Sequence, residues 1–364
     1  MNLAGLVTYS LATRALGRYN LKNNNYSNSM KKHIYVAYTG GTIGMRPSAQ
    51  GFVPAAGFLS QTLANMPEFH RSEMPDFTIH EYDTLIDSSD MSPTDWQFIA
   101  EDIYENYHDY DGFIILHGTD TMSYTASALS FMLENLGKPV IVTGSQIPLA
   151  QLRSDGQENL LNALYLAANY PIPEVTLYFS NQLFRGNRSR KVDADGFNAF
   201  DSPNFPPLLT AGINIEVHTD NLGIHRENKL HISNISAQPI GVVTLYPGIS
   251  TDVIRNTLHQ PVQARILLSL GVGNAPQNPF FLAELKQAAE QDIVILNCTQ
   301  CLRGKVNMTG YANGHALRDS GVISGGDMTP EAALAKLHYL LSKNLALPQL
   351  KKHLVANLRG ELSG

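Results

Sequence analysis

Short apolar runs recur along the chain, and each is followed by a turn rich in small and hydroxyl-bearing residues. The runs span residues 34–38, 113–116, 140–142, 175–179, 241–246, 265–270 and 293–296. They are rich in β-branched and aromatic residues, which favours strands over helices. Nearly continuous apolar strands are typical of parallel sheets that helices cover on both faces. The pattern therefore predicts an α/β fold.

Helices are predicted between these strands. Ser92, Pro93 and Asp95 form a capping box with proline at the first helical position, which indicates a helix start. The apolar positions that follow at helical spacing are Trp96, Ile99, Ile103 and Tyr107. A second set at the same spacing consists of Met122, Ala126, Leu129, Leu133 and Leu136. Because this set stops at Gly137, we expect the second helix to extend to Leu136.

Strand, helix and strand in succession give right-handed crossovers and a doubly wound sheet. In such a sheet the turns at the carboxyl ends of the strands gather along one edge, where ligands bind. The pattern lapses at residues 201–207, and a polar stretch covers 216–238. We therefore predict an α/β protein of two domains joined by a linker at 216–238. The larger N-terminal domain (30–215) holds a doubly wound, mostly parallel sheet, and the smaller C-terminal α/β domain covers 239–364.

Residues 1–29 differ from the rest of the chain. They combine short Leu/Ala-rich pieces with an asparagine-rich run at 20–29, and they show neither a basic start nor a clear cleavage site. A signal peptide is therefore not expected. Met30 followed by two lysines looks like a natural start, so we expect residues 1–29 to be a mostly disordered leader that activity does not require.

Composition narrows the function classes. The length of 364 residues suits two α/β domains, and 43% apolar with 16% charged residues is typical of a soluble globular protein. The formal charge of -6 and the lack of a Lys/Arg cluster argue against a nucleic-acid partner. No apolar stretch reaches the roughly 20 residues that a membrane helix needs, so no membrane partner is expected.

The two cysteines, Cys298 and Cys301, form a single C-x-x-C pair late in the chain. A zinc site usually needs a second such pair, which the sequence lacks. A redox site of the thioredoxin type is the alternative, but reduced thiols in a cytosolic protein are the preferred interpretation. We therefore predict no metal site.

The first candidate motif is TGGTIG, Thr39 to Gly44, which directly follows the first apolar run. Three glycines and two threonines at this place fit a phosphate loop, a dinucleotide-binding turn or a hydroxyl nucleophile on an exposed turn. A dinucleotide site needs G-x-G-x-x-G with an acidic residue about 20 positions on, and a phosphate loop needs G-x-x-x-x-G-K-[ST]; neither occurs. A nucleophile elbow of the form G-x-S-x-G is also absent. The absence of the first two motifs disfavours a dinucleotide-binding turn and a phosphate loop, which are the two alternatives to a hydroxyl nucleophile.

The second candidate motif is HGTDT, His117 to Thr121. A histidine at a strand end is more often structural than catalytic, because it can simply hydrogen-bond the turn. Thr119 and Asp120 lie where a helix is predicted to begin, and an N-cap is the alternative interpretation. An N-cap needs one such residue, whereas this turn has three in a row. A helix start also offers N–H groups to an anion or oxyanion, and a carboxylate beside them suits an ammonium group, so the motif favours an amino-acid ligand.

TGGTIG and HGTDT together closely resemble the bacterial-type L-asparaginases, also called asparaginase/glutaminases. The other stretches that resemble this family are DSSDM (87–91), RGNRSRK (185–191), YPG (246–248), GVGN (271–274), GDMT (326–329) and RGEL (359–362). The resemblance covers residues 31–364, and TGGTIGM, SFMLENLGKP and NCTQC resemble the cytoplasmic type I branch. It implies a cytoplasmic, cofactor-free enzyme that hydrolyses L-asparagine to L-aspartate and ammonia. It also implies a homodimer or homotetramer with each site partly at a subunit interface.

The resemblance implies a role for each matching residue. Thr42 would attack the side-chain amide carbon and form a β-aspartyl ester that water later hydrolyses. Thr119, Asp120 and Lys191 would form a second catalytic cluster, with Asp120 also holding the substrate's α-ammonium. The other substrate-binding residues would be Asp87, Ser88, Ser89 and Ser145. Ser88 and Ser89 would bind the α-carboxylate of the substrate. Backbone N–H groups near Thr119 and Ser145 would stabilise the oxyanion.

The chemistry is coherent without the family, because a threonine hydroxyl needs a nearby proton acceptor to become a nucleophile. Lys191 could be that acceptor if burial lowered the pKa of its amine. Its place in the basic run 185–191 favours a solvated surface cation when the residues are considered alone.

Two positions depart from the family pattern. Where many members carry a tyrosine on the mobile loop, this chain has Phe52, so we name Tyr311 as the candidate phenol. Thr299, Gln300 and Cys301 match a segment that binds a second asparagine in some type I enzymes. An arginine that binds the effector there is replaced by Leu268, and losing a charge-assisted bond of about 1.5–3 kcal/mol argues against strong allostery.

Two other functions stay open. One is the amidotransferase subunit that releases ammonia from glutamine, a family that shares both motifs but adds an N-terminal domain larger than a 29-residue leader. The other is a non-catalytic regulator that binds an amino acid on the same scaffold, which would require a broken set of Thr42, Thr119, Asp120 and Lys191. Ammonia release from asparagine and from glutamine distinguishes the three.

Overall fold

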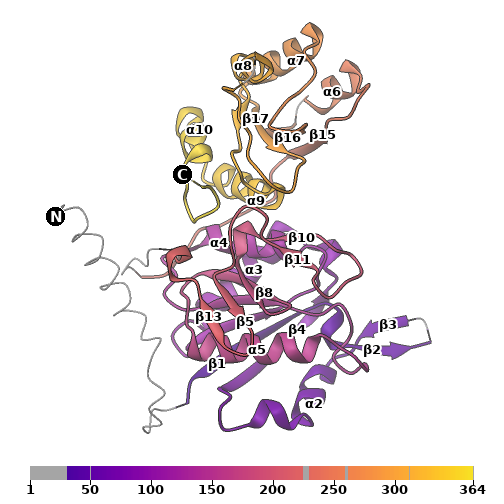
Figure 1. Cartoon of the computed structure of the whole chain (residues 1–364), viewed down its shortest axis with the longest axis vertical. Helices are drawn as coiled ribbons and strands as arrows, with labels where there is room; N and C mark the ends of the chain where they lie inside the picture. The colour runs from indigo at the N-terminus through magenta and orange to yellow at the C-terminus, as the bar shows by residue number, and fades with distance from the viewer. Residues whose placement is uncertain (1–30, 50, 224–228, 259–260, 311, 364) are drawn as a thin grey trace, which may run out of the picture.

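The computed structural model describes residues 31–363 except 50, 224–228, 259–260 and 311. The predicted leader at 1–29 and the candidate phenol Tyr311 lie outside the described residues. The chain forms two lobes, a large one from the N-terminal part and a small one from the C-terminal part (Figure 1).

The large lobe is built on an eight-stranded sheet, counted over the described residues, with the order β13-β12-β9-β8-β7-β5-β1-β4 (Figure 1). Its strands are β1 (His33–Gly40), β4 (Asp76–Ile86), β5 (Gly112–Leu116), β7 (Val140–Thr143), β8 (Val175–Phe179), β9 (Gln182–Arg185), β12 (Leu209–Ala211) and β13 (Ile215–Val217). From β4 to β8 neighbouring strands are parallel, and β9, β12 and β13 extend the sheet with antiparallel pairs. The predicted mostly parallel sheet is confirmed.

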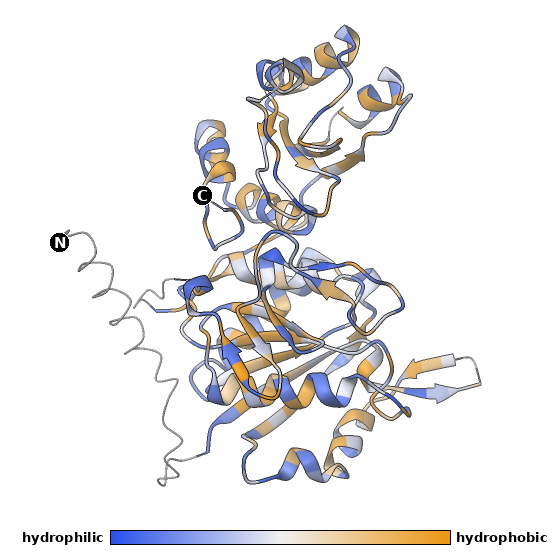
Figure 2. Cartoon of the chain, in the orientation of Figure 1, coloured by the Kyte–Doolittle hydropathy of each residue, from blue (hydrophilic) through white to orange (hydrophobic). Residues whose placement is uncertain are grey.

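Helices cover both faces of this sheet, as the buried apolar strands require. They are α2 (Phe58–Ala64), α3 (Pro93–Glu105), α4 (Met122–Met132) and α5 (Gly156–Asn169). Alternate residues of β1 point to opposite faces: Tyr35 and Ala37 pack with α3 and α4, whereas Ile34 and Val36 pack with α2 and α5. In Figure 2 the strands inside each lobe are coloured mostly as hydrophobic.

The predicted capping box is present at α3, where the N–H and hydroxyl of Ser92 donate to the Asp95 carboxylate at 2.8 and 2.6 Å. The predicted end of the second helix is wrong: α4 stops at Met132 instead of Leu136. Leu133 and Glu134 form the strand β6 (Leu133–Glu134), which pairs antiparallel with β14 (His231–Ile232). The last apolar positions of the helical pattern therefore form a strand, because they pair with a segment distant in sequence. The local spacing of apolar residues does not reveal such a pairing.

The small lobe has a parallel four-stranded sheet in the order β15-β16-β17-β18 over the described residues. Its elements are β15 (Ile240–Thr244), α6 (Thr251–Thr257), β16 (Ala264–Ser269), α7 (Pro279–Glu290), β17 (Val294–Thr299), α8 (Ala312–Asp319), β18 (Ile323–Ser324), α9 (Pro330–Leu341) and α10 (Leu347–Val355). Helices α6 and α7 cover one face, and α9 covers the other while packing against α4 of the large lobe. The predicted smaller C-terminal α/β domain is confirmed, whereas the predicted domain limits stay predictions.

A buried ionic contact joins the two lobes next to the segment that carries Lys191. Arg188 lies in the short 3-10 helix η4 (Gly186–Arg188) and is 1% exposed. Its guanidinium donates to the Asp327 carboxylate at 2.8 Å and to the Gly360 carbonyl at 2.6 Å. Arg190 donates to Glu331 at 3.2 Å from the strand β10 (Arg190–Lys191), which pairs with β11 (Phe200–Asp201). The C-terminal lobe therefore holds β10 in place.

A hairpin projects from the large lobe (Figure 1). It consists of β2 (Met45–Ser48) and β3 (Gly51–Pro54), and it carries Phe52, whose side chain is 48% exposed. In the described part of the chain, no helix combines the length and apolar character needed to cross a bilayer.

Candidate active site

The turn after β1 brings the TGGTIG motif against the HGTDT motif. Gly40 and Gly41 have φ angles of 138° and 89°, in the region that glycine adopts without strain. A Cβ atom on Gly41 would lie 2.4 Å from the backbone nitrogen of Gly118, so only glycine allows this approach. Thr42 and Thr119, which follow these glycines, therefore stand on touching turns.

The two threonines of TGGTIG have different surroundings. Thr39 is buried, and its hydroxyl donates to the Leu116 carbonyl at 2.9 Å, which ties β1 to β5. Thr42 starts the 3-10 helix η1 (Thr42–Gly44) and is partly exposed. Within the described residues the Thr42 hydroxyl makes no hydrogen bond. Thr39 is thus structural, whereas the Thr42 hydroxyl is free to meet a ligand.

His117 is a structural residue. It is fully buried, and burial lowers its pKa to about 4, so the imidazole is neutral at neutral pH. Trp96 Nε1 donates to the Thr125 hydroxyl oxygen at 3.0 Å. The Thr125 hydroxyl can therefore donate its own proton to His117 Nε2, which lies 2.8 Å away. His117 Nδ1 then donates to the Gly118 carbonyl at 2.7 Å. This chain of bonds stiffens the turn and agrees with the preferred interpretation of this histidine.

Lys191 reaches across from β10 to the HGTDT turn. Its Nζ lies 2.9 Å from Thr119 Oγ1 and 2.7 Å from Asp120 Oδ1. The Lys191 side chain is only 20% exposed, whereas that of Asp120 is 65% exposed. The interpretation of Lys191 as a solvated surface cation is therefore wrong, because the side chain is mostly buried and its amine is engaged by the turn.

Gln146 also contacts this cluster, although it is absent from the predicted set. The Thr119 hydroxyl donates to Gln146 Oε1 at 3.0 Å. Gln146 lies in the turn after β7, directly after Ser145. Its position in TGSQIP, at the end of a strand adjacent to β5, was the available signal.

The DSSDM turn lies beside the same glycines. A Cβ atom on Gly118 would lie 2.4 Å from the Ser88 hydroxyl oxygen, and the Thr121 hydroxyl donates to the Ser88 carbonyl at 2.6 Å. Asp87 caps the 3-10 helix η3 (Ser88–Asp90) by accepting the N–H and the hydroxyl of Ser89 at 2.9 and 2.8 Å. These two bonds lower the pKa of Asp87, which keeps its carboxylate ionised and the turn rigid.

Ser145 is buried at the end of β7. Ser145 is 1% exposed, and its hydroxyl has no hydrogen-bond partner in the part of the chain that the structure describes. A buried hydroxyl without a partner costs about 1–3 kcal/mol, so such a group is expected where a ligand completes the site. The first turn of α5 packs against it, because a Cβ on Gly156 would lie 3.1 Å from the Ser145 Cβ.

The predicted effector segment lies at the end of β17 in the small lobe. Thr299 donates to the Gly271 carbonyl at 2.5 Å, and Gln300 donates to the carbonyls of Leu245 and Leu268 at 2.7 and 2.8 Å. Cys301 is exposed at the same turn. Through these contacts the segment is joined to its own sheet, and within the described residues it makes no hydrogen bond to the Lys191 cluster.

The two cysteines are free thiols. Cys298 is buried, and burial raises its pKa to about 12, which keeps it protonated at neutral pH. No cluster of three or more His, Cys, Asp or Glu side chains suited to a metal ion occurs within the described residues.

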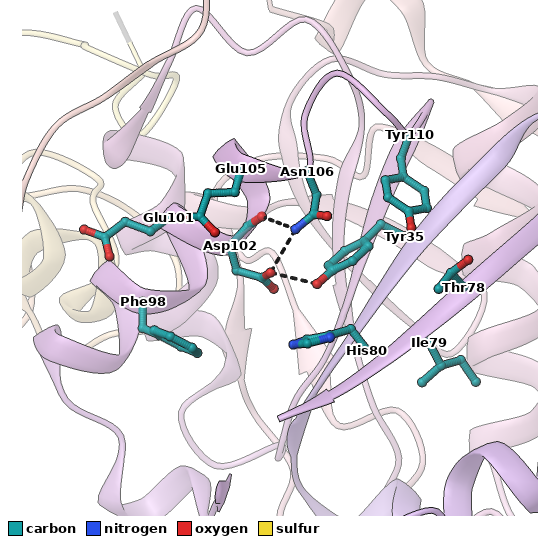
Figure 3. A pocket seen from close by; sticks show the side chains of 10 residues that line it. All are labelled: Tyr35, Thr78, Ile79, His80, Phe98, Glu101, Asp102, Glu105, Asn106 and Tyr110. Atoms are coloured by element: carbon teal, nitrogen blue, oxygen red, sulfur yellow. Dashed lines mark hydrogen bonds between the residues drawn. The ribbon is translucent and has the colours of Figure 1, made fainter. Parts of the chain in front are cut away.

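Cavities large enough for a small molecule occur elsewhere. One of about 400 Å³ lies between β4 and α3 (Figure 3). There Asp102 accepts hydrogen bonds from Tyr35 and Asn106, with Glu101 and Glu105 on the same helix. No predicted site residue lines it, so the candidate active site is the cluster of strand-end turns and not this cavity.

The fold and the site define a two-domain α/β protein with hydroxyl, amine and carboxylate groups gathered at the carboxyl ends of parallel strands. The family model described as "Asparaginase, N-terminal" matches residues 33–222, and "Glutaminase/Asparaginase C-terminal domain" matches residues 239–354. The chain therefore belongs to the asparaginase family. The resemblance expected from the motifs is confirmed.

Individual relatives agree with this assignment. The chain is 68% identical over 333 residues to the protein named L-asparaginase 1 of Escherichia coli (strain K12), covering 92% of this chain and 98% of that one. It is 45% identical over 357 residues to the 60 kDa lysophospholipase of Mus musculus, covering 92% of this chain and 63% of that protein. The solved structure of L-asparaginase I from Vibrio cholerae O1 biovar eltor str. N16961 superposes with a TM-score of 0.86 at 67% identity, covering 92% of this chain and 99% of that one.

Proposed function

We propose that the protein is an L-asparaginase that hydrolyses L-asparagine to L-aspartate and ammonia. Its place in the asparaginase family and its 68% identity to a protein named L-asparaginase 1 support this. The observation that carries the proposal is the contact of Lys191 with both Thr119 and Asp120 on the turn that touches the TGGTIG motif.

In the first half of the proposed reaction Thr42 is the nucleophile. Its oxygen attacks the carbon of the substrate's side-chain amide, and the oxyanion of the tetrahedral intermediate is bound by N–H groups near Thr119 and Ser145. The intermediate collapses when the carbon–nitrogen bond breaks, and the leaving nitrogen departs as ammonia with the proton that the Thr42 hydroxyl gave up. The product is a β-aspartyl ester on Thr42. The Thr42 hydroxyl lies at the start of η1 and makes no hydrogen bond within the described residues, which supports this role.

In the second half, water hydrolyses the ester. Neutral Lys191, bonded to Thr119, accepts the proton of the attacking water and then passes it on to the ester oxygen, which leaves as the Thr42 hydroxyl. L-aspartate is released and the enzyme is regenerated. The contacts of the Lys191 amine with Thr119 and Asp120 support this role, because they hold the amine at the turn.

Substrate recognition is assigned to the surrounding turns. The Asp120 carboxylate, 65% exposed, holds the α-ammonium of asparagine. Asp87, Ser88 and Ser89 form the rigid turn that receives the α-carboxylate. The Ser145 hydroxyl, which has no hydrogen-bond partner among the described residues, bonds the substrate.

The finer features follow the family expectation. We propose a cytoplasmic homodimer or homotetramer in which a neighbouring subunit completes each site, with no cofactor. Tyr311 stays the proposed phenol, since Phe52 on the hairpin has no proton to donate. Because Leu268, whose carbonyl accepts from Gln300 at 2.8 Å, has no charge to bind an effector carboxylate, we expect Thr299, Gln300 and Cys301 to give a weak response to a second asparagine.

Ammonia release from asparagine and from glutamine, each over a concentration series, tests the function. A higher kcat/KM on asparagine with a hyperbolic rate curve is expected. A marked preference for glutamine would favour the amidotransferase subunit, and no release from either would favour a non-catalytic regulator. A sigmoidal curve in asparagine would show that another residue compensates for Leu268.

A further inference from the structure

The backbone of Gln146 is held independently of its side chain. Its N–H donates to both oxygens of the Asp155 carboxylate at 3.1 and 3.0 Å, and the N–H of Ile147 donates to the same carboxylate at 3.1 Å. Asn159 also donates to the Gly144 carbonyl at 3.0 Å. The turn after β7 therefore presents the Gln146 side chain in one direction.

The orientation of the Gln146 amide is set by its neighbours. Its Nε2 donates to the Gly196 carbonyl at 3.1 Å and reaches the Ala194 carbonyl at 3.5 Å. Carbonyl oxygens only accept hydrogen bonds, so the nitrogen of the amide must face this loop. A flipped amide would place its oxygen against these carbonyls. Oε1 is therefore the atom that faces Thr119, at 3.0 Å from its hydroxyl.

This orientation decides where the Thr119 proton goes. Because Oε1 of Gln146 can only accept, Thr119 must donate its single proton to Gln146. The lone pairs of Thr119 Oγ1 are then directed to Lys191 Nζ, which donates to it at 2.9 Å. Asp120 faces the same amine as a second acceptor. On the element of Lys191 itself, the charge of Arg190 is paired with Glu331.

We propose that Gln146 is a positioning residue that commits the Thr119 proton and so directs the lone pairs of Thr119 to the amine of Lys191. The inference rests on the proposed function, in which Lys191 must become neutral to accept a proton. A donor facing a neutral amine stabilises its lone pair, and Gln146 occupies the one donor that Thr119 has.

Two substitutions at Gln146 test this in opposite directions. Gln146→Met removes the acceptor, so Thr119 can donate to a neutral Lys191, and the ascending limb of kcat/KM against pH moves to lower pH. Gln146→Glu keeps an acceptor for Thr119 and adds a negative charge, so the limb moves to higher pH, although its second oxygen loses the bonds to the Gly196 and Ala194 carbonyls. Because Thr119 loses its orientation in Gln146→Met, kcat at the plateau falls about tenfold, while KM changes little.

Gln157→Met is the matched control, because Gln157 is exposed on α5 and bonds Glu68 outside the cluster. It should leave both kcat and the pH profile unchanged. The inference is overturned if the limb stays in place in both variants, or if they lose thermal stability alone. Should Gln146→Met fail to fold, the nearly isosteric Gln146→Glu decides by the direction of its shift. Wild-type protein that releases no ammonia from asparagine would instead overturn the proposed function.

Discussion

The amine of Lys191 lies 2.7 Å from the carboxylate of Asp120, although 71 positions separate the two residues along the chain. The turn before α4 supplies the carboxylate, and β10 supplies the lysine. Contacts of Arg188 and Arg190 with the C-terminal lobe hold the segment that delivers it. The proposed chemistry therefore depends on both lobes, even though the described members of the cluster all belong to the large one.

Lys191→Met should lower kcat on asparagine by about 10² to 10⁴, the usual contribution of a positioned general base. The fold should persist, because methionine keeps the apolar part of the side chain. Steady-state kinetics and thermal unfolding check both statements. Lys286→Met on the exposed surface of α7 is the control, and it should have wild-type activity. A Lys191→Met enzyme with wild-type kcat would remove Lys191 from the mechanism.

The two threonines of the first motif should respond differently to substitution. Thr42→Ala should abolish turnover without changing stability, because its hydroxyl makes no bond within the described chain. Thr39→Val should cost about 1 kcal/mol in the free energy of unfolding, because it removes the buried hydrogen bond to Leu116. Urea unfolding and ammonia release separate the two effects. Full activity in Thr42→Ala would contradict the nucleophile assignment.

Asp327→Asn should destabilise the protein by about 3–5 kcal/mol, because it leaves the buried guanidinium of Arg188 without its ionic partner. Asp252→Asn is the control: the Asp252 side chain is 77% exposed, and its pair with Arg255 should contribute less than about 1 kcal/mol. Denaturant unfolding of both variants measures the difference. Equal stabilities would show that the contact between the lobes does not depend on this charge.

Glu134 should contribute to the loss of stability in acid. Burial alone would raise its pKa, but hydrogen bonds from Ser233, Tyr339 and Lys343 outweigh it and lower the pKa to about 2 from 4.5. Since the folded-state pKa is the lower one, the stabilisation is present above pH 4.5 and is lost as pH falls towards 2.

Unfolding of Glu134→Gln between pH 7 and 2 tests this linkage. The variant should be less stable than wild type at pH 7 and should lose less stability between pH 4.5 and 2. Glu290→Gln, exposed at the end of α7, serves as the control with the wild-type slope. A wild-type slope in Glu134→Gln would show that other carboxylates carry the acid sensitivity.

Much of the fold was predictable because its signals are local. The apolar runs became β1, β5, β7, β8, β15, β16 and β17 with limits close to those expected. The capping box at Ser92 needs only the residues that follow it, and it formed as predicted. The end of α4 was not predictable, because Leu133 and Glu134 pair with β14, nearly a hundred positions away.

The candidate site divides in the same way. The glycines of the first motif could be recognised in the sequence. The reason that glycine is required became clear only from the structure, in which Gly41 packs against Gly118 and Gly118 packs against Ser88. The sequence alone favoured Lys191 as part of a basic surface run, whereas the structure shows its amine donating to the Thr119 hydroxyl oxygen. Gln146 could not be found by residue type alone, since an amide side chain has no special chemistry until its partners fix its orientation.

The amino-acid sequence by itself determined the strands, the helix starts and the turn motifs that mark the family, because apolar periodicity, capping and glycine turns act over a few neighbouring residues. Only the tertiary structure decided which hydroxyl is structural, which lysine is engaged and which amide directs a proton. Those outcomes depend on strand order and on contacts between segments 27 to 77 positions apart, where distances of about 3 Å are set by packing of the whole molecule.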